Sequence, residues 1–459
     1  MLQDKPYYGT EIAVSLYNTC MQWIFSEFRR LWEDAFGVIH SPDKIKSLLR
    51  VPLYSNSIYM VLADAVGALF GFVFWVVASR LYSTEAVGVC SALISAIGLL
   101  QLITTLGLGY GLIRFLKSSD DPVKLINSVF TIIAVLALVV AGIFTLGMGI
   151  WSPSLKIVRE TPFYLLAFLL AVPILVLDDS TDKTMMGGRQ AKFIFIHNLI
   201  YPILKLALLV ALATLFRSFG IFIASTAAMF VGLSVSLFFL VPRTQPGYRP
   251  YFTVKKKEIS KIIGFSIFNY LGDLFWNVPG VLLPLIVINQ LGASMNAYFY
   301  MAWALGSVLT LIPSVVAMAL LAEGAFDETQ LKNHVRRGLR IMVLLLVPSI
   351  VLVWLLANKL LMLYGGLYAQ NATTLLRWLA VAALPFGINS IYFGIKRIQK
   401  DVKPIIILAG SAAGITILCS YLLIPRLGIS GVGIAWLFAQ SVIALVVIPR
   451  DIAHWLAAN

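Results

Sequence analysis

The sequence of 459 residues is 60% hydrophobic and only 12% charged, with a mean hydropathy of +0.90. This composition excludes an ordinary water-soluble globular protein, in which roughly a quarter of the residues are charged. The formal net charge of +14 does not require nucleic acid as a partner, because a basic cytoplasmic face next to anionic membrane lipids accounts for it.

Residues 1–50 precede the first long apolar run. Apolar side chains recur there at steps of three or four, with polar ones between them, which predicts an amphipathic helix on the inner membrane surface. The segment is too polar for a span, and it lacks the basic start and the cleavage site of a signal peptide. Membrane anchoring is its simplest role, with docking of a partner protein as the alternative.

Twelve apolar runs follow, of about the 20 residues that a helix needs to cross a bilayer. We therefore predict an all-α integral membrane protein with twelve transmembrane helices in two six-helix lobes. The predicted spans are 54–79, 86–112, 126–150, 162–178, 193–216, 219–241, 262–289, 294–321, 339–357, 374–395, 403–424 and 430–449.

The connections between the spans are short, so no sizeable soluble domain is expected. The predicted divisions are an N-terminal extension 1–50, a first lobe 51–241, a basic cytoplasmic linker 242–261, a second lobe 262–450 and a cytoplasmic tail 451–459.

Lys and Arg residues are abundant in every second connection between the predicted spans and scarce in the others. With the N-terminus inside, 27 of the 35 Lys and Arg residues fall on the inner side and six on the outer side. Cytoplasmic loops retain positive charge, so this bias predicts a multi-pass protein of the cell membrane with both termini in the cytoplasm.

Two similar stretches, SIYMVLAD at 57–64 and SIFNYLGD at 266–273, each end in an aspartate within an apolar run. Counted from the inner end of each span, Asp64 and Asp273 lie roughly 15 Å deep, near the bilayer midplane. We predict that they are equivalent residues of an internal duplication. Because each lobe has an even number of helices, a pseudo-two-fold axis along the membrane normal would relate the lobes, with substrate between them.

A carboxylate at the midplane costs about 2.5–3.5 kcal/mol and normally faces a cavity or a partner. Asp64 and Asp273 are therefore candidates for lining a solvated pathway, with a buried hydrogen bond to a neighbouring helix as the alternative. Asn269 and Asn277 lie one turn before and after Asp273 and extend a polar stripe along its helix. A second stripe, Trp303 to Ser314, favours helix packing over ligand contact.

Two cations accompany these acids. Lys205 lies near the middle of the fifth span, where it would pair with an aspartate or meet an anionic group of a substrate. Arg114, at the inner end of the second span, fits an ordinary positive flank equally well.

Catalytic and metal-binding motifs are missing from the sequence. LDDSTDK at 177–183 places three acids at an inner helix end, where a solvated loop is favoured over a metal site. The four histidines are scattered, and the three cysteines lack metal-binding spacing. We expect no enzyme and no resident metal.

Three stretches carry a resemblance to a known family: the first begins ASRLYSTEAVGVCSALISAIG at Ala78 and runs to Leu116, and LYGGLYAQNATTLLRWLAVAALP at 363–385 and LGISGVGIAWLFAQ at 427–440 follow. They resemble polysaccharide flippases of the multidrug/oligosaccharidyl-lipid/polysaccharide exporter (MOP) superfamily. The similarity covers about residues 52–450, in order and at the corresponding helices.

The resemblance implies an alternating-access transporter that flips a polyprenyl-linked oligosaccharide across the cytoplasmic membrane for polysaccharide synthesis. A Na⁺ or H⁺ gradient or the membrane potential would drive it, and Asp64 and Asp273 are the candidate ion-coupling residues. The related lipid II flippases carry an arginine beside the aspartate of their first span, where this chain has Ala63. Contact with the lipid phosphate therefore falls on Lys205, with Arg114.

Asn269 and Asn277 complete the candidate substrate contacts. The expected partners are the lipid-linked oligosaccharide, membrane lipids and glycan-assembly proteins, with no nucleic acid. Two alternatives stay open: a cation-coupled multidrug exporter of the same superfamily, which would prefer an acidic, aromatic cavity, and a membrane scaffold for glycan assembly, in which the midplane charges would be dispensable.

Overall fold

The computed structural model of the protein describes residues 52–448, except 217 and 327–330. The predicted N-terminal extension 1–50 and tail 451–459 lie outside the described residues. By its contacts, the described chain from Tyr59 onward forms one compact unit. The predicted division of this unit into two lobes stays a prediction.

All regular structure in the described residues is helical. The first half comprises α3 (Pro52–Leu81), α4 (Thr84–Thr104), α5 (Leu108–Phe115), η1 (Leu116–Ser118), α6 (Pro122–Trp151), η2 (Pro153–Leu155), α7 (Ile157–Glu160), α8 (Pro162–Gly187), α9 (Ala191–Leu212), α10 (Gly220–Val235), η3 (Ser236–Leu240) and α11 (Val241–Thr244). The second half comprises α12 (Lys256–Leu291), α13 (Ala293–Phe326), α14 (Leu331–Met362), α15 (Gly366–Ile398), α16 (Val402–Leu427) and α17 (Ser430–Val447).

Twelve segments of the described chain are long and apolar enough to cross a membrane, which confirms the predicted number of spans. The largest differences lie at the helix ends. α8 continues to Gly187 and α12 begins at Lys256, so part of the predicted basic linker is helical. LDDSTDK lies inside α8, and the prediction of a solvated loop was wrong. Its Asp178 and Thr181 are buried.

The predicted second span, 86–112, is broken in the structure. α4 ends at Thr104, and Leu106 and Gly107 both adopt positive φ, of 46° and 67°, before α5 begins. A Cβ on Gly107 would lie 2.4 Å from Cβ of Tyr270 on α12. Only glycine permits both this backbone conformation and this approach of α12.

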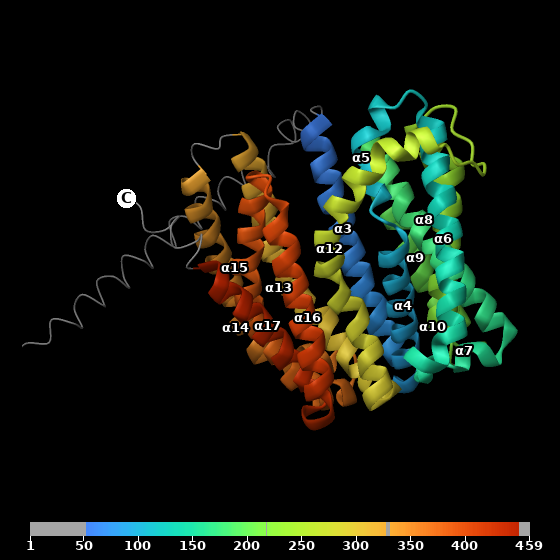
Figure 1. The fold of residues 1–459 in the computed structure, drawn as a ribbon. Helices are drawn as coiled ribbons and strands as arrows, with labels where there is room; N and C mark the ends of the chain where they lie inside the picture. Colours follow the sequence, from blue (N-terminus) through green and yellow to red (C-terminus); the bar gives the residue numbers. More distant parts are fainter. Residues whose placement is uncertain (1–51, 217, 327–330, 449–459) are drawn as a thin grey trace, which may run out of the picture. The chain divides into compact units, whose positions relative to one another are not determined.

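Helices far apart in the sequence meet at α4. α4 packs against α12 and α13, and Figure 1 shows α6, α8 and α9 on one side of this region and α14 to α17 on the other. A Cβ on Gly88 would lie 1.7 Å from the carbonyl O of Ala293. Asn296 Nδ2 donates to Gly88 O, at 2.8 Å, and to Ser91 Oγ, at 3.1 Å. Close packing and buried hydrogen bonds therefore join the two halves.

The connection from α11 to α12 is held against α6. Asn127 Nδ2 donates to the Arg249 carbonyl O, at 3.0 Å, and Asn127 Oδ1 accepts from the Tyr251 N–H, at 3.2 Å. Ser128 and Thr131, also on α6, accept from the next backbone N–H groups of the connection. Three side chains thus replace the water that an exposed loop would bind.

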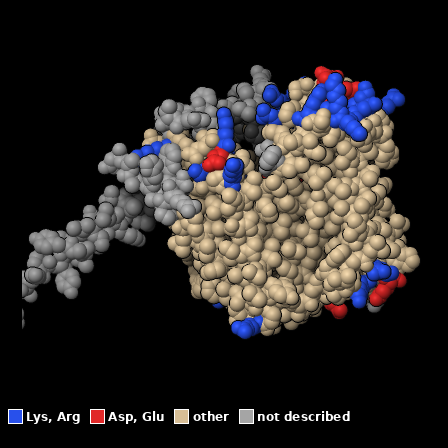
Figure 2. All heavy atoms as spheres, in the orientation of Figure 1, with Lys and Arg blue, Asp and Glu red and all other residues tan. Residues whose placement is uncertain are grey.

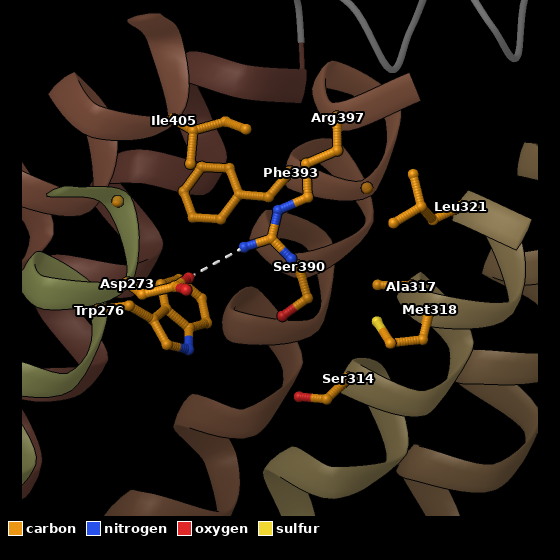
Figure 3. A pocket seen from close by; sticks show the side chains of 12 residues that line it. Asp273, Trp276, Ser314, Ala317, Met318, Leu321, Ser390, Phe393, Arg397 and Ile405 are labelled. Atoms are coloured by element: carbon orange, nitrogen blue, oxygen red, sulfur yellow. Dashed lines mark hydrogen bonds and ion pairs between the residues drawn. The ribbon is translucent and has the colours of Figure 1, made fainter. Parts of the chain in front are cut away.

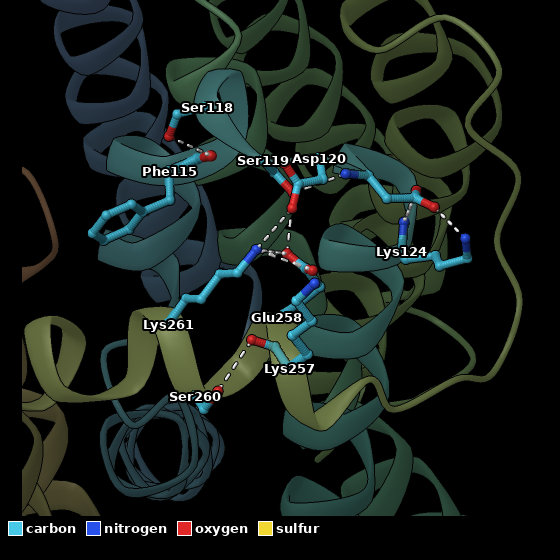
Figure 4. Close-up of polar contacts among 10 residues, drawn as sticks. Phe115, Ser118, Ser119, Asp120, Lys124, Lys257, Glu258, Ser260 and Lys261 are labelled. Atoms are coloured by element: carbon cyan, nitrogen blue, oxygen red, sulfur yellow. Dashed lines mark hydrogen bonds and ion pairs between the residues drawn. The ribbon is translucent and has the colours of Figure 1, made fainter.

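Ion pairs hold the start of α12 to the connection between α5 and α6. Lys261 Nζ lies 3.1 Å from Asp120 Oδ2 and 3.4 Å from Glu258 Oε1, and Ser119 Oγ donates to Glu258 (Figure 4). Many Lys and Arg side chains gather at this end of the molecule, and few are seen at the opposite end, with an uncharged belt between them (Figure 2). We call the end that holds the start of α12 and the connection between α5 and α6 the basic end.

Candidate functional site

Asp273 on α12 joins three parts of the chain. Its Oδ1 lies 3.2 Å from Nη2 of Arg397, in the last turn of α15, and the Tyr110 hydroxyl of α5 donates to its Oδ2. Asn277 Nδ2 donates to the Asp273 carbonyl O, at 2.7 Å. The side chains of Asp273 and Arg397 remain 31% and 47% exposed, so the pair is reachable from an adjoining space.

That space is a cavity of about 250 Å³ between α12, α13, α15 and α16 (Figure 3). Its lining combines one ion pair, two hydroxyls, two aromatic rings and aliphatic groups. The lining residues are Gly272, Asp273, Trp276, Ser314, Ala317, Met318, Leu321, Ser390, Phe393, Gly394, Arg397 and Ile405. Few polar groups among mostly apolar walls are typical of a small-molecule site.

A second cavity, of about 160 Å³, lies along α12 and shares Trp276 with the first. Asn277 and Gly280 line it from α12, and Ser307 and Thr310 line it from α13. Trp303, Gly306, Leu379, Phe386 and Trp436 complete it. The Trp303 to Ser314 stripe therefore lines the two cavities, and the expectation that it serves helix packing more than ligand contact stays a prediction. The predicted polar stripe of α12 does reach cavities, through Asp273 and Asn277.

Arg397 was not among the residues singled out from the sequence. The pattern FGIKRIQK places it after a predicted span that ends at residue 395, where it counted only as a positive flank. α15 continues to Ile398, and this extra turn directs the guanidinium at Asp273. The available signal was an arginine within one turn of the end of the span 374–395, while Asp273, in the span 262–289, needed a cationic partner.

Lys205, on α9, lines neither cavity. Its Nζ is 3.8 Å from the centre of the Phe74 ring of α3 and 5.8 Å from that of Tyr201. Within the described part of the chain it makes no ion pair, so the expected pairing with an aspartate is not seen. Aromatic faces attract a cation through their quadrupole, and this contact leaves the ammonium group able to meet an anion.

The remaining predicted residues are not brought together. Arg114 is exposed, with its guanidinium 4.9 Å from the centre of the Phe265 ring. The side chain of Asn269 lies outside the described residues. Asp64 is exposed on α3 and interacts electrostatically with Lys183 and Asp182 of α8. Asp64 and Asp273 therefore have different surroundings, and their equivalence stays a prediction.

A further charged cluster lies between α8 and α9. His197 contacts both Asp178 and Asp182. From the sequence, the four histidines were expected to lie far apart and these two acids to lie in a solvated loop. The two acids stand four residues apart, a spacing that places both on one face of a helix. Had the predicted fourth span been extended from residue 178 to residue 182, this spacing would have indicated that Asp178 and Asp182 share one helix face.

Comparison with known families decides the classification. The model of the polysaccharide biosynthesis protein family matches residues 53–324, more than half of the chain. The chain belongs to this family. The MatE family model matches residues 286–422. No curated protein sequence gives a significant match.

Solved structures share the fold of this polysaccharide biosynthesis family member. The lipid II flippase MurJ, in an inward closed conformation, superimposes with a TM-score of 0.70 at 14% identity, covering 87% of this chain and 89% of that chain. An inward-facing multidrug resistance MATE family transporter of the MOP superfamily gives 0.65 at 15% identity, covering 86% and 98%. A MOP superfamily transporter from Pyrococcus furiosus gives 0.61 at 16% identity, covering 89% and 97%.

The family match and the twelve apolar segments make the protein a multi-pass membrane protein of the polysaccharide biosynthesis family, and its fold is that of the MOP superfamily transporters and the flippase named above. The predicted twelve-helix fold class and the family resemblance are confirmed. The predicted pseudo-two-fold arrangement is compatible with these neighbours and is not itself tested.

Proposed function

We propose that the protein flips a polyprenyl phosphate- or pyrophosphate-linked oligosaccharide across the cytoplasmic membrane, for polysaccharide or glycoconjugate synthesis. The observation that carries this proposal is the cavity beside Arg397, in a chain that belongs to the polysaccharide biosynthesis family. A phosphate and a sugar chain are too polar to cross about 30 Å of hydrocarbon unaided, whereas a polyprenyl tail can remain in lipid.

Arg397 is the proposed contact for the phosphate. A guanidinium has five N–H donors, and within the described residues Asp273 accepts from only one of its nitrogens, Nη2. The other donors can bind an oxyanion in a bidentate manner. Asp273 then acts as a competing anion that holds Arg397 in position until substrate arrives.

The rest of the two cavities suits sugar rings. Trp276 lies between them, and hydroxyl and amide groups of Ser314, Ser390, Thr310 and Asn277 line their walls. Aromatic faces pack against the C–H faces of sugars, while hydroxyl and amide groups exchange hydrogen bonds with sugar hydroxyls. Lys205 and Arg114 remain proposed secondary contacts for the anionic group.

We keep the predicted orientation, with the basic end and both termini in the cytoplasm, because many Lys and Arg side chains gather at this end and few are seen at the opposite one (Figure 2). Na⁺ or H⁺ would drive transport, with Asp64 and Asp273 as the proposed coupling residues. Glycan-assembly proteins are the proposed cellular partners.

A multidrug exporter is the second candidate, favoured by a specific observation. Asp273 and the rings of Trp276 and Phe393 line the larger cavity, and a carboxylate beside aromatic rings also suits an organic cation. The MatE model matches this part of the chain.

Purified protein in liposomes separates the two candidates. A fluorescent polyprenyl phosphate-linked oligosaccharide is placed in one leaflet, and its access to an external quencher is followed. Arg397→Ala is expected to slow flipping at least about tenfold, the loss of one good charged contact. Arg377→Ala is the matched control, because Arg377 lies on the same helix over the Trp354 ring and lines neither cavity. Wild-type protein that exports a cationic dye and leaves the oligosaccharide unmoved would contradict the flippase.

A further inference from the structure

The cluster around His197 is a buried group of titratable side chains that lines neither cavity. Nε2 lies 3.1 Å from Asp178 Oδ1 and Nδ1 lies 3.4 Å from Asp182 Oδ1. The imidazole of α9 thus sits between two carboxylates of α8, and its side chain is only 3% exposed.

Proton counting constrains this arrangement. A neutral imidazole has one N–H donor and one nitrogen lone pair. Two ionised carboxylates would therefore leave one of them facing that lone pair, which is repulsive. The contacts become favourable when both ring nitrogens carry protons, or when one carboxyl group is protonated and donates to the ring. In either case the cluster holds one proton more than neutral histidine with two carboxylates.

Neighbouring charges strengthen this requirement. Asp179 and Lys183 of α8 form their own pair, at 3.5 Å, and Asp64 of α3 interacts with Asp182 and Lys183. α10 contains no charged residue. Its Gly232 faces the ring, and a Cβ there would lie 3.0 Å from Nε2. Tyr201 of α9 stacks on the ring. Four carboxylates therefore share Lys183 and His197, and like charges in an apolar bundle favour proton uptake.

The cluster also has a route for proton exchange. The exposed fraction of the side chain falls from 27% at Asp182 to 12% at Asp178 and 3% at His197. Asp182 is the member that interacts with the exposed Asp64. A proton can thus enter at the Asp64–Asp182 edge and pass to the imidazole.

We propose that His197, Asp178 and Asp182 form a proton-binding site in the first half of the chain, and that it exchanges its proton through Asp182 during the transport cycle. We assign a proton as the ligand because, among the described residues, no group of His, Cys, Asp and Glu side chains has an arrangement that could hold a metal ion. The coupling to transport rests on the proposed function, whereas the proton site itself does not.

The first test needs no substrate. ¹⁵N-histidine-labelled protein in which His40, His334 and His454 are replaced by Gln retains His197 as its single histidine, and its ring nitrogens are observed by NMR at pH 7.5. A free imidazole, with a pKa of about 6.5, is mostly neutral there. We expect a doubly protonated ring, or a protonated carboxyl band in the infrared spectrum that Asp178→Asn or Asp182→Asn removes. A neutral ring with no such band would overturn the site.

The second test addresses coupling, with the liposome assay run on oligosaccharide and on dye at several external pH values. Wild-type transport is expected to change by up to about tenfold per pH unit, as a one-proton step allows. Asp178→Asn and Asp182→Asn should flatten that profile. Asp121→Asn is the control, since Asp121 lies outside the cluster, where it caps α6 and pairs with Lys124. Correctly folded variants that keep the wild-type profile would refute coupling. Transport of dye alone, with the profile flattened, would refute only the flippase.

Discussion

Asp273 shows how a charged residue is accommodated in an apolar helix. Its two carboxylate oxygens bind groups from different parts of the chain, Arg397 of α15 and Tyr110 of α5. Both partners satisfy the carboxylate oxygens, which would otherwise lie unpaired in an apolar helix. The same contacts place a cation and an anion at one cavity wall, where an incoming anion or cation can compete for either.

The strength of this pair can be measured with a double-mutant cycle. Asp273→Asn, Arg397→Ala and the double variant should give a coupling free energy of unfolding of about 0.5–1 kcal/mol, because both side chains are about a third or more exposed and solvent screens the pair. Denaturant titration in detergent measures it. Strict additivity of the two substitutions would show that the pair makes no net contribution to stability.

At the scale of the helices, Gly107 permits the break in the second predicted span. Gly107→Ala should lower the unfolding free energy by about 1–2 kcal/mol for the positive φ and by a further 1–3 kcal/mol for the overlap with Tyr270. Gly247→Ala is the matched control, since Gly247 also has a positive φ, of 84°, but an added Cβ would meet no atom within 4 Å. Equal losses in the two variants would show that the contact with α12 is unimportant.

The side chain of Asp121 caps the N-terminus of α6. Asp121 Oδ1 accepts from the Lys124 N–H, at 3.0 Å, and Pro122 occupies the first turn. The hydrogen bond and ion pair with the Lys124 side chain, together with that N–H, hold the pKa of Asp121 below its usual value. The charge therefore stabilises the folded state above the unfolded pKa of about 3.9, and this stabilisation is lost as pH falls through the lower folded pKa.

Two substitutions separate the cap from the charge. Asp121→Ala should cost about 1 kcal/mol, as for other lost N-caps. Asp121→Asn keeps a capping oxygen and should cost less at pH 7, and its difference from wild type should begin to shrink below about pH 4 and be lost as pH falls through the lower folded pKa. Thermal unfolding across pH checks both. A difference between the Asp121→Asn variant and the wild-type protein that is as large at about pH 3 as at pH 7 would contradict the electrostatic explanation.

At the scale of the whole molecule, the distribution of charge predicts an orientation. The basic end should face the cytoplasm. In intact cells, a membrane-impermeant maleimide should label Lys156→Cys, between η2 and α7 at the opposite end, and leave Lys257→Cys unlabelled until the cells are opened. Background variants without Cys20, Cys90 and Cys419 serve as controls. Labelling of Lys257→Cys in intact cells would reverse the proposed orientation.

Hydropathy alone was enough to predict the number and approximate positions of the helices, because a bilayer demands long apolar runs whatever the tertiary structure. It was weaker at helix ends. The break at Leu106 and Gly107 depends on the close approach of Tyr270, and the last turns of α8 and α15 carry charges that an apolar window excludes. Those same turns hold Asp182 and Arg397, two of the charges that matter most.

The sequence by itself determined a membrane-embedded, all-helical chain of twelve spans, because that outcome follows from the solvent in which each segment must be stable. It also identified Asp273 and Asn277 as polar residues on one helix face, since helical periodicity is local. Only the tertiary structure decided that Arg397 and Tyr110 meet Asp273 and that His197 lies between Asp178 and Asp182. The pairs that Asp273 makes join residues more than a hundred positions apart, and the position of His197 depends on how α8 and α9 pack, so no local pattern encodes either.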